Sequence, residues 1–311
     1  MKERILVTGG AGYVGSRFIP LLLQNGYKVR VLDNLMYEQP SLLNYFINPD
    51  FEFILSEITD EKNVKDAMKD VDIVVHLAAI VGAPACQIDP DRARRVNVEG
   101  AKLVNKLRGK KPIIYPSTGS VYGKLEDICT EESSVNPLSL YGETKWEAEQ
   151  AITHSDNYVV YRPATAFGLS QRLRLDLMPN DFTYQAIKNN NLVVYEGSAK
   201  RTFLHVYDFA RALLYAITHF DEMKNQVYNL GHEDMNCTKR EIAEIIQKYH
   251  KFYLHFAEFG SDPDKRDYEV SYKKLRTCGF ETKITLDEGI QELIRGYKMI
   301  HLRNPYSNYQ G

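Results

Sequence analysis

The chain has 311 residues, of which 44% are hydrophobic and 26% are charged, and its formal net charge is −2. This length allows one large domain or two smaller ones, and the composition is that of an ordinary globular protein. A balanced charge argues against nucleic acid as the main partner, because neutralising phosphates usually needs a basic face. The four cysteines lack C-x-x-C spacing, and we find no signal peptide and no stretch able to span a bilayer. We therefore expect a protein of the reducing cytoplasm, with no metal site and no membrane partner.

The first half of the chain alternates short β-rich runs with amphipathic stretches. In chain order we predict a strand at "RILVTG", a helix from Tyr13 to Asn25, strands at "KVRVLD" and "FEFILS", a helix from Asp60 to Lys69, a strand at "VDIVVHLAA", a helix from Asp91 to Leu107, a strand at "KPIIYPST", a helix at "LYGETKWEAEQAIT" and a strand at "YVVYRP". Near-continuous apolar strands that alternate with helices indicate a parallel sheet covered on both faces.

After Ala164 this alternation stops. We predict a loop and a helix between Ser170 and Asn191, then a strand at "LVVYEG", a strand and a helix in "TFLHVYDFARALLYAI", and a strand at "QVYNLG". From Thr238 onward two helices with strand-like pieces between them are expected. We predict a first domain made of residues 1–165 with about 203–231, and a smaller α/β lobe, interleaved with it, made of 166–202 and 232–311.

The stretch "VTGGAGYVGS" joins the first strand to the first helix. Gly9, Gly12 and Gly15 are spaced three apart, and such glycines allow a tight turn, close approach of a pyrophosphate and close packing of helix on strand. The helix N-terminus adds free N–H groups and a positive dipole end. Asp33 follows Gly15 by 18 residues and ends the second strand, where a carboxylate can accept both hydroxyls of an adenosine ribose but repels a 2′-phosphate. The pattern predicts a Rossmann-type doubly wound parallel sheet that binds NAD rather than NADP; the alternative is a glycine-rich turn without a ligand.

A second motif, "SLYGETKWEAE", places Tyr141 four residues before Lys145 on one face of a predicted helix. A phenol titrates near pH ~10, and lowering that value to ~7 needs roughly 4 kcal/mol of differential stabilisation. A nearby ammonium and the positive nicotinamide ring of NAD could supply it in a partly desolvated site. Tyr141 then becomes a base that removes a proton from a sugar hydroxyl while hydride leaves the same carbon for NAD.

A hydroxyl side chain at the end of the fifth predicted strand completes this arrangement. In "YPSTGSVYG" Thr118 lies at the carboxyl edge of the sheet, where open α/β sheets bind ligands. It can hydrogen-bond the reacting oxygen and orient it toward Tyr141. Ser117 and Ser120 are alternatives on spacing alone.

Taken together, these motifs resemble the NAD-dependent nucleotide-sugar epimerase/dehydratase family of extended short-chain dehydrogenases/reductases. The resemblance covers nearly the whole chain and includes "TGGAGYVG", "LDN", "HLAA", "NVEG", "STGSVYG", "YGETK", "RTFLHVYDFARAL" and "RDYEVSYKKLRTCGF". The stretches "DNLMYEQPSLL", "LAAIVGAPAC", "RLRLDLMPNDFTYQA" and "DPDKRDYEVS" are similar to capsule or lipopolysaccharide-pathway members, one type of which is a GDP-heptose 4-dehydrogenase.

The resemblance implies roles for individual residues. It implies that Thr118, rather than Ser117 or Ser120, is catalytic together with Tyr141 and Lys145. The implied NAD contacts are Gly9, Gly12, Tyr13, Val14, Gly15, Asp33, Asn34, Glu57, Ile58, Leu77, Ala78, Ala79, Asn97, Ser117, Tyr141, Lys145 and Pro163. The implied contacts of the sugar nucleotide, GDP- or UDP-linked, are Val81, Thr118, Thr165, Asp176, Leu177, Asn180, Arg201 and Arg266, the two arginines holding the diphosphate. A homodimer through the helices near 91–107 and 140–153 is also implied.

Departures from the family pattern narrow the expected chemistry. Family 4,6-dehydratases carry an Asp–Glu pair directly after the catalytic Thr, and decarboxylases keep the Glu, but here Gly119 and Ser120 follow Thr118. Thr165 also replaces the usual Asn. We therefore expect an enzyme that oxidises a sugar hydroxyl, at C4, as a 4-epimerase or 4-dehydrogenase of surface polysaccharide biosynthesis. The alternatives are another reaction of the family, or a non-catalytic NAD-sensing or scaffold protein, which typically loses the Tyr–Lys pair.

Overall fold

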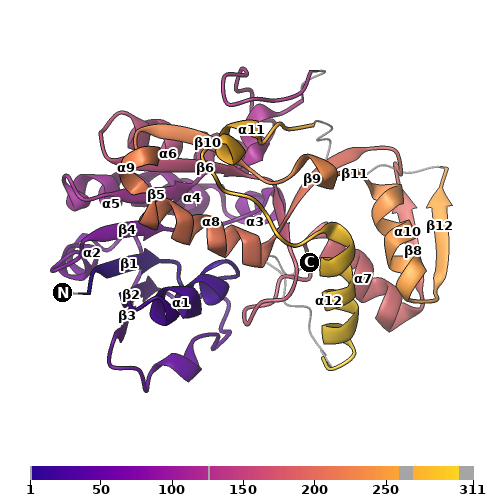
Figure 1. The fold of residues 1–311 in the computed structure, drawn as a ribbon, viewed down its shortest axis with the longest axis horizontal. Coiled ribbons are helices and arrows are strands. Elements are labelled where there is room, and N and C mark those ends of the chain that lie inside the picture. Colours follow the sequence, from indigo (N-terminus) through magenta and orange to yellow (C-terminus); the bar gives the residue numbers. More distant parts are fainter. Residues whose placement is uncertain (1, 125–126, 259–268, 301–311) are drawn as a thin grey trace.

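A seven-stranded parallel sheet forms the centre of the larger part of the molecule. The structure, a computed structural model, describes residues 2–124, 127–258 and 269–300 (Figure 1). The strand order is β10-β6-β5-β4-β1-β2-β3, and every neighbouring pair is parallel. The strands are β1 Arg4–Thr8, β2 Lys28–Asp33, β3 Phe51–Leu55, β4 Ile73–His76, β5 Ile113–Pro116, β6 Tyr158–Pro163 and β10 Gln226–Leu230. The predicted doubly wound parallel sheet is confirmed.

Apolar side chains on both faces of the sheet explain why its central strands are apolar without alternation. Every residue of β4 and β5 is buried, as expected for strands covered on both sides. The helices that cover the sheet are α1 Gly15–Gln24 and α8 Val206–Thr218 on one face, and α2 Glu61–Ala67, α5 Gly100–Arg108 and α6 Leu140–Thr153 on the other.

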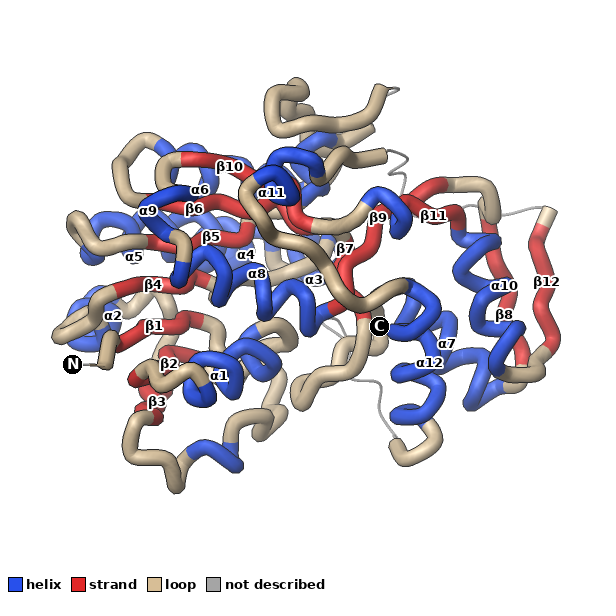
Figure 2. Tube along the Cα trace, viewed as in Figure 1, coloured by secondary structure: helices blue, strands red, loops and turns tan. Residues whose placement is uncertain are grey.

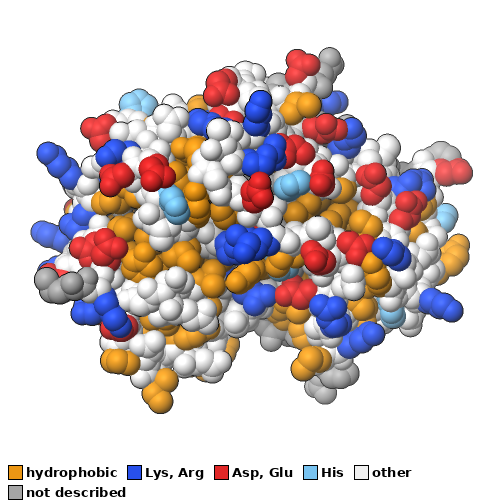
Figure 3. Space-filling view, in the orientation of Figure 1, with side chains coloured by type: hydrophobic (Ala, Val, Ile, Leu, Met, Phe, Trp, Pro, Cys, Tyr) orange, Lys and Arg blue, Asp and Glu red, His pale blue; other side chains and the backbone are white. Residues whose placement is uncertain are grey.

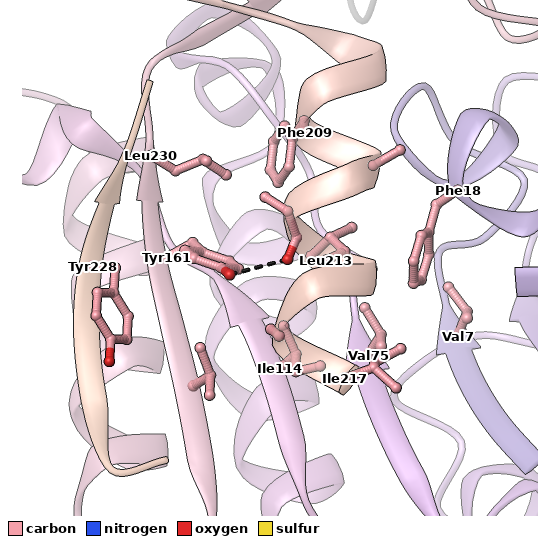
Figure 4. Packing of buried hydrophobic residues seen from close by; sticks show 14 of the residues in the cluster. Val7, Phe18, Val75, Ile114, Tyr161, Phe209, Leu213, Ile217, Tyr228 and Leu230 are labelled. Carbon is pink, nitrogen blue, oxygen red and sulfur yellow. Dashed lines mark hydrogen bonds between the residues drawn. The ribbon is translucent and has the colours of Figure 1, made fainter. Parts of the chain in front are cut away.

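The core between α8 and the sheet is continuous with α1. Figure 4 shows Leu213 and Ile217 of α8 in this layer, near Phe18 of α1, all of them nearly or completely buried. The Tyr161 hydroxyl donates to the backbone oxygen of Ala212 at 3.0 Å, so its polar end is satisfied within the layer. This packing fixes the carboxyl edge of the sheet, where the loops of the candidate site begin.

The helix predicted for 91–107 is interrupted in its middle. The structure has α4 Pro90–Arg94, a π-helical turn at Arg95–Glu99, and then α5. Asn97 lies within the π-helical turn and is 2% exposed. Such turns often occur where a side chain must be aimed at a specific partner, and Asn97 holds the loop after β4, as described below.

A second group of elements lies beside the sheet, at the right of Figures 1 and 2. It contains a three-stranded sheet of order β11-β9-β7 and a parallel pair, β12 with β8. The strands are β7 Thr165–Phe167, β8 Asn191–Tyr195, β9 Lys200–His205, β11 Asn236–Thr238 and β12 Tyr253–Ala257, and the larger helices are α7 Met178–Asn189, α10 Lys239–Tyr249 and α12 Leu286–Tyr297. The remaining short helices are α3 Ala83–Ile88, α9 Phe220–Met223 and α11 Lys273–Thr277. The division into domains at 165, 203 and 231 stays a prediction.

A buried carboxylate ties this second group to the first. Asp208 of α8 is 0% exposed, accepts the backbone N–H groups of Lys283 and Ile284 at 2.9 and 2.8 Å, and pairs with Arg211 at 2.5 Å. Charged acceptors make the stronger hydrogen bonds in proteins. Asp208 therefore fixes the segment that leads into α12.

We predict that Asp208→Ala lowers the free energy of unfolding by about 3 kcal/mol, because it leaves two backbone donors without their acceptor and removes the carboxylate that pairs with Arg211. The matched control is Asp221→Ala, whose carboxylate is 92% exposed and pairs only with Lys224. Denaturant unfolding of both variants checks this. Equal, small losses in the two variants would contradict the role given to Asp208.

Candidate active site

The carboxyl edge of the sheet opens into one large cleft of about 950 Å³. This volume is at the upper end for small-molecule and cofactor sites. The loops after β1, β2, β3, β4 and β5, the start of α6 and parts of β7, α7 and β9 all contribute to its wall. Ligands of open α/β sheets bind at this edge, so the cleft is the candidate active site.

The glycine-rich turn after β1 has the close approaches expected of a dinucleotide cradle. Gly9 has φ +69°, and a Cβ added there would lie 2.5 Å from the Ala78 nitrogen. A Cβ on Gly15 would lie 2.4 Å from the Gly10 carbonyl oxygen. A side chain at either position would therefore push apart the turn, α1 and the loop after β4.

Asp33 stands at the rim of this cradle, at the end of β2. Its carboxylate accepts the backbone N–H groups of Ala11 at 3.0 Å and Leu35 at 2.8 Å. Burial raises the pKa of Asp33, against the lowering effect of Leu35, Ala11 and the Arg172 guanidinium. Each carboxylate oxygen keeps lone pairs for further donors, so Asp33 can shape the turn and still accept ribose hydroxyls.

The predicted adenine end of the cleft is formed by the loops after β2 and β3. Asn34 donates to the Glu57 carboxylate at 3.0 Å, and Arg92 pairs with the same carboxylate at 3.5 Å. Ile58 is buried beneath them and lines the cleft. These contacts hold Glu57 at the wall.

Helix α6 carries the predicted catalytic pair, Tyr141 and Lys145. The Ser139 hydroxyl accepts the Gly142 N–H at 3.2 Å and so begins the helix immediately before Tyr141. Tyr141 and Lys145 both line the cleft. Lys145 is only 5% exposed, and its ammonium lies 4.1 Å from the centroid of the Tyr115 ring, an arrangement that favours the charged form.

Burial nevertheless acts strongly on this lysine. Desolvation lowers the pKa of Lys145 to about 7, although the charges of Glu149 and Cys86 act in the opposite direction. Glu149 follows Lys145 by one helical turn, but it is held by Arg162 in a buried ion pair of 2.7 Å. The groups around Lys145 therefore stabilise its charged ammonium form only partly. A hydrogen-bond acceptor or an anion that enters the cleft stabilises this form further.

Hydroxyl groups at the end of β5 face the same space. Thr118 caps the 3₁₀ turn Gly119–Tyr122 by accepting the Ser120 N–H at 3.1 Å, and as an acceptor there it keeps its own proton for another partner. Ser117 is 3% exposed, and its hydroxyl has no partner among the described residues. A buried hydroxyl in a cleft wall needs a partner, which a ligand in the cleft can provide.

The residues that line the cleft are suited to bind NAD. Gly9 and Gly15 permit close approach of a diphosphate, Asp33 offers acceptors for a ribose, and Ser117 offers an unused hydroxyl. His76, behind the cleft, is neutral, because burial lowers its pKa to about 3, and its Nδ1 lies 2.7 Å from the Thr8 hydroxyl oxygen.

Other parts of the cleft wall carry the predicted substrate residues. Arg201 of β9 is 4% exposed and lines the cleft together with Thr165. Asp176 is paired with Arg174 at 2.5 Å. Burial raises the pKa of Asp181, in the first turn of α7, to about 6. The cleft wall therefore combines guanidinium groups with one carboxyl group, that of Asp181, whose raised pKa makes it easier to protonate.

The structure brings most of the predicted site residues into one cleft. Its lining includes Gly9, Gly12, Tyr13, Val14, Gly15, Asp33, Asn34, Glu57, Ile58, Leu77, Ala78, Ala79, Val81, Ser117, Thr118, Tyr141, Lys145, Pro163, Thr165, Asp176, Leu177 and Arg201. Arg266 lies outside the described residues.

Two predicted ligands lie behind the wall instead. The Asn97 amide exchanges hydrogen bonds with both backbone groups of Ile80 at 2.7 and 3.0 Å and donates to the Thr144 hydroxyl at 3.0 Å. Asn180 is 1% exposed; it accepts the Gly168 N–H at 2.9 Å and donates to the Arg174 carbonyl oxygen at 2.8 Å. Their polar groups are used by the protein, so both residues position the wall.

Sequence reasoning missed Tyr37, Arg172 and Arg174, which also line the cleft. The only signal was the run "RLRLD", in which two arginines alternate with leucines before an aspartate. Alternation of this kind is typical of an exposed strand, and nothing local shows that both guanidinium groups become buried.

Within 2–124, 127–258 and 269–300, no three His, Cys, Asp or Glu side chains are grouped as metal ligands would be. In that same part of the chain, every helix is too short or too polar to cross a bilayer. On the face drawn in Figure 3, acidic and basic side chains are interspersed.

Comparison with known proteins places the chain in a family. The model of the NAD dependent epimerase/dehydratase family matches residues 5–231. UDP-glucuronic acid decarboxylase 1 of Arabidopsis thaliana is 30% identical over 96% of this chain and 70% of its own length, and dTDP-glucose 4,6-dehydratase of Streptomyces niveus is 29% identical over 95% and 93%. The crystal structure of UDP-glucose 4-epimerase from Thermotoga maritima with UDP-glucose is similar at 25% identity and TM-score 0.83, covering 95% of this chain and 99% of that one.

These three proteins are named for three different reactions, so the likeness identifies the family and not the reaction. The family match covers more than half of the chain, and the cleft has the cradle and the hydroxyl groups that a dinucleotide needs. The chain belongs to the NAD dependent epimerase/dehydratase family, and its cofactor is NAD.

Proposed function

We propose that the protein oxidises the C4 hydroxyl of a nucleotide-diphosphate sugar, as a 4-epimerase or a 4-dehydrogenase in surface polysaccharide biosynthesis. The observation that carries the proposal is that Tyr141, Lys145 and Thr118 line the same cleft as the dinucleotide cradle. A protein that binds NAD without catalysis does not need these three side chains in its cleft.

The protein's own residues handle the proton of the reacting hydroxyl. Thr118 donates a hydrogen bond to the sugar oxygen, and the Tyr141 phenolate takes the proton from it. Lys145, one helical turn away, stabilises the phenolate, and the buried site strengthens that attraction. Bound NAD supplies the hydride acceptor. The reaction either stops at the ketone or is completed by reduction from the opposite face, with Tyr141 returning the proton.

The residues after Thr118 favour these two outcomes over elimination or decarboxylation. Those reactions need an acid or base beside the catalytic hydroxyl, and the two positions here are Gly119 and Ser120. Glycine has no side-chain functional group and the serine hydroxyl does not ionise near neutral pH, so neither side chain is an effective general acid or base. Elimination and decarboxylation are therefore not part of the proposal for this chain.

Guanidinium groups in the cleft wall support a diphosphate substrate. Arg201 is buried in the wall, and its planar fork suits phosphate oxygens. Relatives of the chain carry names with UDP- and dTDP-linked sugars, and the resemblance to capsule-pathway members favours GDP. We propose a UDP- or GDP-linked sugar.

The proposal also includes the cell compartment and the oligomeric state of the enzyme. We propose a cytoplasmic homodimer that pairs through the helices near 91–107 and 140–153. Within one chain these helices are joined by ion pairs of Arg94 with Glu143 at 3.2 Å and with Glu147 at 2.8 Å. The two helices can therefore present one joint surface.

We predict that Tyr141→Phe abolishes conversion of the sugar nucleotide but leaves folding and NAD binding intact, because the ring alone preserves packing. General-base catalysis is worth about 10²–10⁴-fold, so kcat falls at least ~100-fold. The matched control is Tyr158→Phe, a phenol outside the cleft, which keeps full activity. Steady-state kinetics with calorimetry of NAD binding checks both.

Lys145→Met extends this prediction to the charge beside the phenol. It shifts the residual activity to higher pH, because the phenolate loses the cation that favours it. The wild-type rate rises through an apparent pKa well below ~10, the free phenol value. More than about a tenth of wild-type activity in Tyr141→Phe, where at least ~100-fold loss is expected, would mean that another group removes the proton.

We predict that Arg201→Ala raises the KM for the sugar nucleotide by about 10- to 100-fold, the loss expected for a hydrogen bond between charged groups, and leaves NAD affinity nearly unchanged. Arg240→Ala, an exposed arginine of the same lobe outside the cleft, is the control. An unchanged KM in Arg201→Ala would assign the diphosphate to other residues.

A further inference from the structure

Two segments far apart in the sequence close one wall of the cleft. The first is the loop 34–42 after β2, and the second is the segment 168–176 between β7 and α7, drawn as a loop in Figure 2. The Leu173 N–H donates to the Gln39 side-chain oxygen at 2.9 Å. The Arg172 guanidinium lies 4.0 Å from the centroid of the Tyr37 ring. Both Tyr37 and Arg172 line the cleft.

The segment 168–176 is fastened directly to the cofactor cradle. The Tyr13 hydroxyl donates to the Gly168 carbonyl oxygen at 2.7 Å, and the Ser170 hydroxyl donates to the Tyr13 carbonyl oxygen at 2.7 Å. The hydroxyls of Ser16 and Ser170 are 2.6 Å apart. Tyr13 precedes α1 and Ser16 lies in its first turn, so these hydrogen bonds hold the segment against the predicted phosphate-binding end of that helix.

The loop 34–42 is held in an uncommon backbone conformation. Leu35 and Glu38 both have φ +52°, a left-handed region that residues with a side chain seldom occupy. The Asp33 carboxylate accepts the Leu35 N–H at 2.8 Å, and the Ser41 hydroxyl donates to the Ala11 carbonyl oxygen at 2.7 Å. Such strain persists where surrounding contacts determine the conformation, and here those contacts bring Tyr37 to Arg172.

The charge of Arg172 suits the ligand of this wall. The side chain is 2% exposed, and the Asp33 carboxylate is among the charges that act on it. Burial lowers the pKa of Arg172 to about 10, which keeps the guanidinium charged near neutral pH. A dinucleotide brings a diphosphate into the same cleft, and a buried planar cation stacked on an aromatic ring is well suited to it.

We propose that the Tyr37–Arg172 stack is a clamp that retains the dinucleotide, joining the loop after β2 to the segment before α7 across the cofactor's exit. The same two segments are also joined by the hydrogen bond from the Leu173 N–H to the Gln39 side chain. Opening the clamp separates the loop 34–42 from the segment 168–176 and frees the cofactor to leave. The inference rests on NAD binding and not on which sugar reaction the enzyme performs.

The test measures the rate of NAD release without any sugar. Protein loaded with isotopically labelled NAD is mixed with excess unlabelled NAD, and the label that stays with the protein is followed over time. Tyr37→Ala removes the ring, and we expect release to become roughly 5- to 30-fold faster, the range for loss of a desolvated cation–π contact. Tyr37→Phe is the matched control, because the Tyr37 hydroxyl has no hydrogen-bond partner among the described residues. It should release NAD at the wild-type rate.

Two further variants distinguish a clamp from two independent contributions to NAD retention. They are Arg172→Gln and the double variant that combines it with Tyr37→Ala. If the stack is the retaining contact, the double variant releases NAD no faster than the faster single variant. Wild-type release in Tyr37→Ala, or single effects that multiply in the double variant, would overturn the proposal. If Arg172→Gln fails to fold, the contrast between Tyr37→Ala and Tyr37→Phe decides alone. Because no sugar is present, a wrong assignment of the reaction leaves this result unaffected.

Discussion

The ammonium group of Lys145 is held almost completely inside the protein, and the arrangement of the site depends on how its charge is supported. Burial favours the neutral amine, and the pKa of Lys145 is lowered to about 7 even with the opposing charges of Glu149 and Cys86. The face of the Tyr115 ring and the carboxylate of Glu149 act against this, but Arg162 already neutralises Glu149. The Lys145 ammonium group therefore has too little negative charge near it. A phenolate at Tyr141 is one of the groups that can supply this charge.

This constraint links the helix to the sheet. Tyr141, Lys145 and Glu149 follow one another at four-residue spacing along α6, so a single helix face carries the proposed base, the ammonium group and a carboxylate. Arg162, from β6, also donates to the Tyr122 hydroxyl at 3.0 Å. Tyr122 ends the 3₁₀ turn that Thr118 begins. The same buried network thus positions both the helix and the hydroxyl that faces it.

The sequence predicted the elements whose signal is local. Apolar strands, the glycine turn at Gly9 and the spacing of Tyr141 and Lys145 are patterns within a few residues, and the structure has strands, turn and helix at these places. Three-residue strands such as β7 and β11 carry too few side chains to show a period. They form because β9 lies between them.

Contacts between distant segments could not be predicted in this way. Tyr37 and Arg172 contact each other but lie far apart in the sequence. No local periodic pattern in the sequence indicates that they meet. Asn97 and Asn180 are polar residues near expected ligands, yet their amides are used by Ile80 and by the segment that includes Gly168. Tertiary contacts decide whether a buried polar side chain binds a ligand or the protein backbone. The spacing of residues in the sequence does not reveal these contacts.

The central claim is oxidation of a sugar hydroxyl on a nucleotide sugar, and a substrate panel tests it most directly. The NAD-loaded protein is incubated with UDP-, GDP-, CDP- and dTDP-linked sugars, while NADH absorbance and product mass are followed together. The account predicts that one sugar nucleotide gives either a product of unchanged mass or one lighter by two hydrogen atoms, the latter with NADH formed. A product that has lost water or carbon dioxide, or no conversion of any sugar nucleotide by protein that binds NAD, would contradict it.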